Sequence, residues 1–165
     1  IIFIWAIIIT LFCVQEVKAD ERACLAEAVY FEARSETFTA QLAVANVIIE
    51  RVKDDGYPGT ICRVVHQGKH RGGKPVRHRC MFSYWCDGKP ETIANVQAYK
   101  MAVSVADLSM EGVILDSTEG ATHYHATYVL PYWALTENFH RMGQVGKHIF
   151  YVDTRNRGVY NSTND

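Results

Sequence analysis

The sequence predicts an α+β fold that is mainly helical, with a few short strands, and two observations support this prediction. Before residue 112, apolar residues recur at intervals of three and four positions, which is the spacing of one face of a helix. After it, segments 121–130 and 148–152 are rich in β-branched and aromatic residues, which are typical of strands. Helices followed by grouped strands indicate an α+β domain, and 165 residues with 48% hydrophobic content suffice for one buried core.

The long helices are predicted from their apolar stripes and from the residues at their ends. The first is expected over about 20–34 and the second over about 38–54. Gly56 is expected to end the second helix in a left-handed conformation. A third long helix is expected over about 90–112, with a proline at its start and a glycine at its end. Segment 131–146 has no clear period, and we expect a helical turn and a loop there.

The N-terminal segment has the features of an export signal. The first fourteen residues carry no charge, whereas a membrane-spanning helix needs roughly 20 apolar residues and a signal core about 7–15. Val17 and Ala19 then provide a small-x-small cleavage site. We interpret residues 1–19 as a secretory signal, 20–153 as the functional domain and 154–165 as a polar tail. An uncleaved membrane anchor, or a buried helix of the fold, are the alternatives for the first segment.

Four cysteines follow the predicted signal, namely Cys24, Cys62, Cys80 and Cys86. An even number of cysteines in an exported protein suggests two disulfides, and the sequence leaves all three pairings open. Buried free thiols are one alternative. A four-cysteine zinc site is another, although the closely spaced CxxC pairs that such sites use are absent.

One segment departs from the nearly balanced charge of the chain. The net charge is −1, yet residues 69–79 contain five Lys or Arg, two His and no acid. We expect an exposed, solvated loop there. Outside the cell such a loop would attract an anionic polymer in a salt-dependent manner. Nucleic-acid binding is not expected, because no aromatic residues are interleaved with the basic ones.

Glu32 is the candidate catalytic residue, because it lies on a helical face that is otherwise apolar. Leu25 and Ala28 precede it by seven and four residues, so all three share one face of the first helix. Apolar surroundings disfavour the ionised carboxylate and raise its affinity for a proton, as a general acid requires. Glu36, one turn further on, is the nearest second acid, and the other glutamates of this helix are interpreted as solvated.

Aromatic and histidine side chains gather in the predicted loops and strand ends. Trp85 and Tyr124 are among the rings that could contact the apolar C–H faces of a sugar, although each could equally belong to the core. His123 and His125 share one face of a predicted strand and could bind a metal, contact a substrate or simply pack. Since no carboxylate stands at an obvious third-ligand spacing, we predict neither a metal nor a cofactor.

Several ordered motifs resemble those of a known family. In chain order they read "ACLAEAVYFEARSE", "QLAVANVIIERVKDDGYPGTICRVVHQG", "CMFSYWCDG", "GATHYHATYVLPYWA" and "GKHIFY". Together they resemble the cell wall hydrolase family of spore cortex-lytic enzymes of the SleB and CwlJ type, from about Ala23 to about Tyr151. The resemblance implies a lysozyme-like fold, a catalytic domain over 20–153 and peptidoglycan glycan strands as substrate. The family's catalytic acid, the first glutamate of its "EAR-x-E" block, corresponds to Glu32.

The resemblance and the aromatic pattern together suggest a set of substrate-binding residues. The candidates are Glu36, Phe82, Ser83, Trp85, Tyr124 and His125. The chain departs from the family pattern at two positions: Ser35 replaces a glycine, and Met81 replaces a glutamine that precedes the Phe-Ser pair. Met81 lacks the hydrogen-bonding amide of that glutamine, so the corresponding sugar contact is not expected here.

The resemblance also implies a reaction. In a lytic transglycosylase, one carboxyl group protonates the oxygen of the MurNAc–GlcNAc β-1,4 bond and then accepts a proton from the C6 hydroxyl, which leaves a 1,6-anhydro end. A hydrolytic muramidase or glucosaminidase, or a non-catalytic wall-binding module, are the alternatives. The protein is expected to be monomeric and secreted or periplasmic at the cell wall, and to contact a membrane only through an uncleaved leader.

Overall fold

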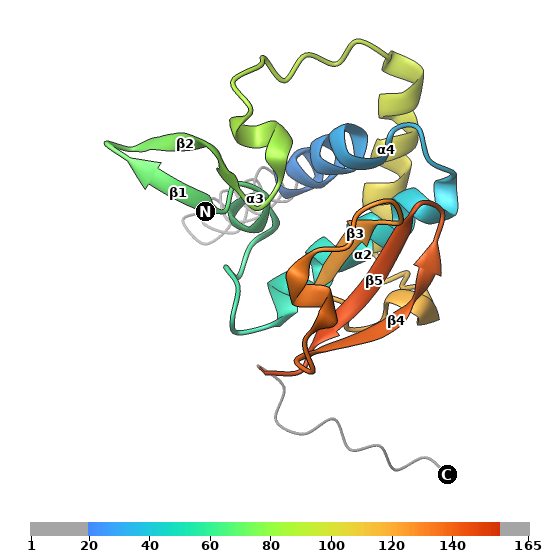
Figure 1. The fold of residues 1–165 in the computed structure, drawn as a ribbon. Helices are drawn as coiled ribbons and strands as arrows, with labels where there is room; N and C mark the ends of the chain where they lie inside the picture. Colours follow the sequence, from blue (N-terminus) through green and yellow to red (C-terminus); the bar gives the residue numbers. More distant parts are fainter. Residues whose placement is uncertain (1–19, 156–165) are drawn as a thin grey trace, which may run out of the picture.

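The computed structural model describes residues 20–155, in which helices and short strands form the α+β fold that the sequence predicts (Figure 1). The predicted leader, residues 1–19, and the part of the predicted tail from 156 to 165 lie outside the described residues. Within the described part of the chain, no helix has both the length and the apolar character that a membrane span requires.

Four α-helices of the described region pack around the larger of two apolar clusters. They are the helix over residues 20–33, α2 (Phe38–Lys53), α3 (Ile61–Val65) and α4 (Val96–Met110). The shared interior consists of fully buried aliphatic side chains, including Leu25, Ala28, Ile48, Val64, Val65 and Val105. A 3₁₀ helix, η1 (Ser83–Cys86), closes one side of this cluster through Tyr84.

The predicted cap of the second helix and the predicted start of the third are wrong, and the local hydrogen bonds explain why. Gly56 does not adopt a left-handed conformation, because α2 already ends at Asp54, whose backbone is extended and whose carboxylate accepts the N–H of Gly56. The third long helix begins at Val96 rather than near residue 90. Asn95 provides its cap by accepting the N–H of Ala98 at 3.0 Å, and the preceding residues are not helical.

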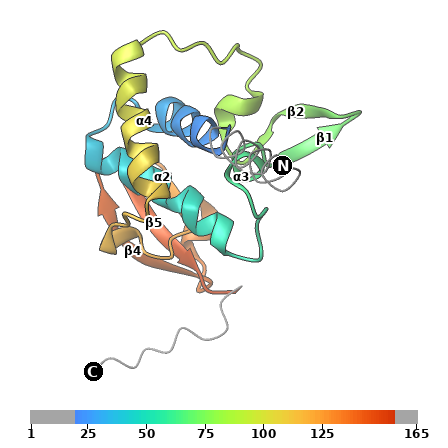
Figure 2. The same ribbon diagram turned by 180° about the vertical axis from the view of Figure 1, so that it is seen from behind.

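A three-stranded antiparallel sheet covers α2 (Figure 2). It consists of β3 (His123–Ala126), β4 (Phe139–Val145) and β5 (His148–Asp153), in the order β3-β5-β4. Phe150 of β5 joins Val44 and Val47 of α2 in a second apolar cluster. The expectation for segment 131–146 is half correct: the helical turn exists as η3 (Tyr132–Leu135), whereas β4 was missed.

The basic segment is a β-hairpin rather than the loop that we expected. β1 (Gly68–Arg71) pairs with β2 (Lys74–Cys80), and the hairpin projects from the body of the molecule (Figure 1). Gly72 and Gly73 form its two-residue turn with φ of +57° and +76°, the left-handed values that such a hairpin turn requires. The prediction of exposure was correct, because the Lys and Arg side chains of the segment are all exposed.

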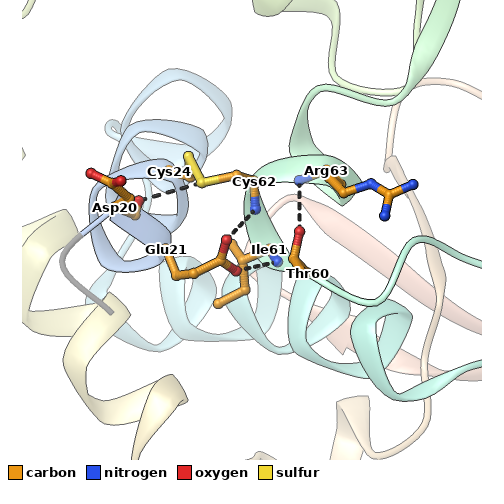
Figure 3. The surroundings of a disulfide bond; sticks show 7 residues. All are labelled: Asp20, Glu21, Cys24, Thr60, Ile61, Cys62 and Arg63. Carbon is orange, nitrogen blue, oxygen red and sulfur yellow. Dashed lines mark hydrogen bonds between the residues drawn. A yellow bond between two sulfur atoms is a disulfide. The ribbon is translucent and has the colours of Figure 1, made fainter. Parts of the chain in front are cut away.

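The four cysteines form two disulfides, as predicted, so the free-thiol and zinc alternatives are excluded. Cys24–Cys62 joins the first described helix to α3, and the Glu21 carboxylate beside it accepts backbone N–H groups at the N-terminus of α3 (Figure 3). Cys80–Cys86 joins the end of β2 to η1. The first link holds the helix that carries Glu32, and the second holds η1, a wall of the cleft described below.

Candidate active site

Glu32 lies where an apolar helix face meets the surface. Leu25 and Ala28, which precede it on the same face, are fully buried. Glu32 occupies the last turn of this helix and is only partly exposed. The face that the sequence predicted therefore brings a carboxyl group to the margin of the core rather than into bulk water.

Glu32 lines an open cleft of about 310 Å³. One wall is the end of the helix over residues 20–33, and the other walls are η1 and the irregular segment that follows it. The lining residues are Phe31, Glu32, Arg34, Ser83, Tyr84, Asp87, Lys89, Pro90 and Glu91. The cleft thus combines aromatic rings with charges of both signs, a composition suited to a polar ligand with apolar faces.

Burial sets the protonation of Glu32. It raises the pKa of this carboxyl group, because the ionised form loses hydration in its partly dry surroundings. Two groups oppose this effect: the hydroxyl of Tyr124, which donates a hydrogen bond to Oε2 at 3.2 Å, and the positive charge of Arg51. Since burial dominates, Glu32 holds its proton to a higher pH than a free glutamate, while its ionised form still has two stabilising neighbours.

Arg51 provides a fixed, buried cation behind Glu32. Its side chain is 5% exposed, and its Nε donates to the carbonyl of Thr122 at 2.7 Å. The rings of Tyr57 and Phe82 each lie 5.3 Å from the guanidinium carbon. Burial lowers the pKa of Arg51, while attraction to the neighbouring phenols and to Glu32 opposes that shift. These contacts hold the guanidinium where its charge reaches the carboxylate.

Tyr84 contributes a second functional group to the cleft. Its ring stacks on Phe31 at a centroid distance of 4.8 Å, and its side chain is 8% exposed. Its hydroxyl has no hydrogen-bond partner among residues 20–155. Burial, together with repulsion from nearby glutamates including Glu32, raises the pKa of Tyr84 far above its ordinary value, so this hydroxyl remains a donor. The hydroxyl is buried, and leaving such a donor without a partner costs about 1–3 kcal/mol.

The structure brings only some of the predicted site residues together. Ser83 lines the cleft, and Tyr124 contacts Glu32 directly. Phe82 is 2% exposed and belongs to the core, where it packs beneath Arg51. Trp85 does not line the cleft; its ring stacks on that of His66, with the ring centroids 3.6 Å apart.

Glu36 is also placed outside the cleft. Its side chain is 9% exposed and pairs with Nζ of Lys147 at 3.2 Å. It packs against the turn between β4 and β5 so closely that a Cβ on Gly146 would lie 2.7 Å from its Oε2. Glu36 therefore anchors a turn of the sheet instead of lining the cleft beside Glu32.

His125 lies on the sheet face opposite to Tyr124. Because successive strand residues alternate in direction, the contact between Tyr124 and Glu32 directs His125 away from the cleft. His125 is buried, and its ring nitrogens lie 2.9 Å from the carbonyl of Ala126 and 3.0 Å from the hydroxyl of Tyr151. Its hydrogen bonds are thus satisfied within the fold.

His123 shares that opposite face, where burial lowers its pKa to about 4. Its Nδ1 lies 3.1 Å from the hydroxyl of Thr122. Within residues 20–155 no three His, Cys, Asp or Glu side chains are grouped closely enough to hold a metal ion.

Sequence reasoning missed several groups around Glu32. These are Arg34, Arg51, Asp87, Lys89 and Glu91. Arg51 could have been found, because it continues the buried Val44–Val47 face of α2 with a charge, as Glu32 continues the Leu25–Ala28 face of its own helix. The acidic and basic residues of segment 87–91 carry no such signal, since an irregular chain gives them no period.

Comparisons with known proteins identify the family and the fold. A family model described as Cell Wall Hydrolase matches residues 35–151, a match that begins just after Glu32. The catalytic domain of the Bacillus cereus SleB protein is 25% identical, with 81% of this chain and 90% of that chain covered and a TM-score of 0.56. The catalytic domain of the germination-specific lytic transglycosylase SleB from Bacillus anthracis is 26% identical, with coverages of 79% and 93% and a TM-score of 0.58. A search of curated protein sequences found no match.

Proposed function

This chain belongs to the cell wall hydrolase family, and we propose that it acts as a lytic transglycosylase with Glu32 as its single catalytic acid. The family and its similarity to SleB catalytic domains make it an enzyme that degrades peptidoglycan, so a non-catalytic wall-binding module is not supported. The observation that carries the finer proposal is the partly buried Glu32 in an open cleft, with its pKa raised by burial.

The proposed reaction uses one carboxyl group twice. Protonated Glu32 gives its proton to the glycosidic oxygen as the bond from that oxygen to C1 of MurNAc breaks. The resulting carboxylate stabilises the oxocarbenium-like sugar. It then accepts the proton of the C6 hydroxyl while the C6 oxygen bonds to C1, so Glu32 is regenerated and no water is consumed.

The neighbours of Glu32 fit both halves of this cycle. Burial favours the protonated form that begins the reaction. The Tyr124 hydroxyl and the Arg51 charge favour the carboxylate that exists between the two steps. The Tyr84 ring, stacked on Phe31, gives the cleft an aromatic surface for an apolar face of the sugar.

The position of Glu36 supports a mechanism with a single acid. A hydrolytic muramidase would use a second carboxylate to orient a water molecule across the sugar from the acid. Glu36 is the nearest acid in the sequence, yet its carboxylate pairs with Lys147 and does not line the cleft.

A hydrolytic muramidase is the second candidate, because two other acids line the same cleft. Asp87 and Glu91 come from the segment that follows η1, whereas Glu32 comes from the first described helix. Either acid could hold a water molecule on the face of the sugar away from Glu32. The two candidates differ in the product that they leave.

Product analysis in H₂¹⁸O tests the proposal. Purified peptidoglycan is digested by the parent protein, with Glu32→Gln as the inactive reference, and the released fragments are measured by mass spectrometry. We expect 1,6-anhydro ends, which are lighter by one water and contain no ¹⁸O. Glu91→Gln and Asp87→Asn should give the same product. Reducing ends that contain ¹⁸O, and that disappear in one of these two variants, would instead establish the muramidase.

We also propose that the protein acts outside the cytoplasm, as a monomer, after removal of residues 1–19. A substrate in the cell wall requires export, and the apolar first segment with its small-x-small site supports it. The intact mass of the exported protein should correspond to a chain that begins at Asp20. A mass that includes the first segment would favour the membrane anchor.

A further inference from the structure

The β1–β2 hairpin is a concentrated positive surface beside the cleft. Its five Lys and Arg side chains are all exposed, and none forms an ion pair with an acid of residues 20–155. These cations are Lys69, Arg71, Lys74, Arg77 and Arg79. The hairpin projects from the body of the molecule in both views (Figures 1 and 2), so these charges contribute little to packing.

The hairpin is held in place at both of its ends. The Gly72–Gly73 turn fixes its tip, and the Cys80–Cys86 disulfide ties its base to η1. The N–H of Met81 also donates to the carbonyl of Gln67 at 2.9 Å, which closes the base a second time. Since η1 supplies Ser83 and Tyr84 to the cleft, the disulfide links the positive surface directly to a cleft wall.

One cation of the hairpin contacts the rim of the cleft, next to an irregularity in β2. The pairing register shifts between Gly68 and His70, and His78 in the bulged part of β2 has a φ of +57°. Such a backbone is unfavourable for a residue with a side chain and persists only where the surroundings impose it. Next to it, Arg77 donates from Nε to the carbonyl of Asp87 at 2.9 Å, and Asp87 lines the cleft.

We propose that this hairpin binds the carboxylates of the stem peptides that hang from the glycan strand. The inference rests on the proposed function, because a strand seated at Glu32 carries a peptide on every MurNAc, and these peptides leave the cleft at its rim. Their free carboxylates are negatively charged and therefore complement the positive charge of the hairpin. Guanidinium and ammonium groups bind carboxylates by charge-assisted hydrogen bonds, of which the arginine bonds can be bidentate.

The position of the hairpin favours stem peptides over other anions. A phosphate-rich wall polymer or an anionic membrane would meet a basic surface anywhere on the protein. The stem peptide is covalently attached to the sugar being cleaved, so it arrives at the cleft rim, where Arg77 and the disulfide place the hairpin.

Two substrates separate the stem from the glycan. Strands that carry stem peptides are compared with the same strands after an amidase has removed the stems. The test variant is Lys69→Gln with Arg79→Gln. The control, Lys100→Gln with Arg141→Gln, removes one exposed lysine and one exposed arginine away from the hairpin. KM and kcat are measured on both substrates at low and high salt.

On strands with stems, we expect the test variant to raise KM by about three- to tenfold with little change in kcat, as two solvent-exposed ion pairs would provide. The increase should diminish at high salt. On stripped strands the parent and the test variant should have the same KM, and the control should match the parent on both. Equal losses on both substrates, or no loss on either, would overturn the proposal.

A binding measurement keeps this inference separate from the proposed reaction. Glu32→Gln protein is sedimented with intact sacculi, with amidase-treated sacculi, and with anionic lipid vesicles. We expect the substitutions Lys69→Gln and Arg79→Gln, added to Glu32→Gln, to reduce binding only to sacculi that carry stems. Hairpin-dependent binding to stripped sacculi that retain phosphate polymers, or to the vesicles, would assign the surface to another partner. If the parent cleaves neither substrate, the proposed function fails, while this measurement still decides the role of the hairpin.

Discussion

Two carboxyl groups four residues apart have opposite surroundings. Glu32 lies in an open cleft, and its neighbours are a phenol hydroxyl at 3.2 Å and a buried guanidinium. Glu36 lies against the β4–β5 turn and pairs with the ammonium of Lys147 at 3.2 Å. The first group faces a space that a substrate could enter, whereas the second faces the fold.

The difference shows that the surroundings, rather than the residue type, decide which acid is available for chemistry. Glu36 is held against the β4–β5 turn by its ion pair with Lys147, which leaves no space for a sugar beside it. Burial without a direct ion pair raises the pKa of Glu32 while the cleft leaves the group accessible, as a group that acts first as acid and then as base requires. Each of the following measurements tests this contrast.

The largest expected difference is in catalytic rate. Glu32→Gln keeps the shape of the side chain but cannot transfer a proton, so the initial rate of peptidoglycan clearing should fall about 10²- to 10⁴-fold. Glu36→Gln should reduce that rate less than about threefold and lower stability by about 1 kcal/mol through loss of its ion pair. Equal loss in the two variants would contradict the assignment of Glu32.

A smaller effect is expected in the pH profile of Tyr124→Phe. The Tyr124 hydroxyl donates to the ionised Glu32 and lowers its pKa, so its removal raises that pKa further. Glu32 then remains protonated to higher pH, so the alkaline limb of the kcat/KM profile should shift to higher pH. Tyr151→Phe is the matched control, because its hydroxyl contacts His125 on the other sheet face. A limb that is unmoved or lower in Tyr124→Phe would refute the role of this hydrogen bond.

The smallest effect is expected in stability. Burial raises the pKa of Glu32 in the folded state, so the folded protein loses stability as pH rises from the unfolded-state value through the raised one. Each unit of difference corresponds to about 1.4 kcal/mol. The gain in melting temperature from Glu32→Gln should therefore grow as pH rises above the ordinary pKa of a glutamate, about 4.3. A gain that is independent of pH would show that burial does not tune this carboxyl group.

The helices were predicted well because their signals are local. An apolar stripe at intervals of three and four residues predicted α2 almost to its ends. Its N-terminus is capped by the adjacent Thr37, whose hydroxyl accepts the N–H of Ala40. β4 was missed because its sequence, "FHRMGQV", contains a glycine and three polar residues, and its register shifts between Arg141 and Gly143. A strand of this kind is stabilised by its pairing with β5, which no local pattern reveals.

The site was predicted only in part, for a related reason. Glu32 could be found because its helix face is regular. Tyr124 contacts Glu32 but is not among the residues that line the cleft, and strand alternation places His125, expected on the same wall, on the opposite face. The rest of the cleft comes from η1 and from residues 87–91, which approach Glu32 only when the chain folds.

The sequence by itself determined which helices form, that one helix carries an acid on its apolar face, and that the cysteines form disulfides. These properties depend on residues close together in the chain or on composition. Only the tertiary structure decided that Glu32 faces a cleft while Glu36 faces Lys147, that Arg51 lies behind the acid, and that the basic segment is a hairpin tied to the cleft wall. The pKa of a carboxyl group depends on every charge and dipole within several ångströms, and those neighbours come from distant parts of the chain.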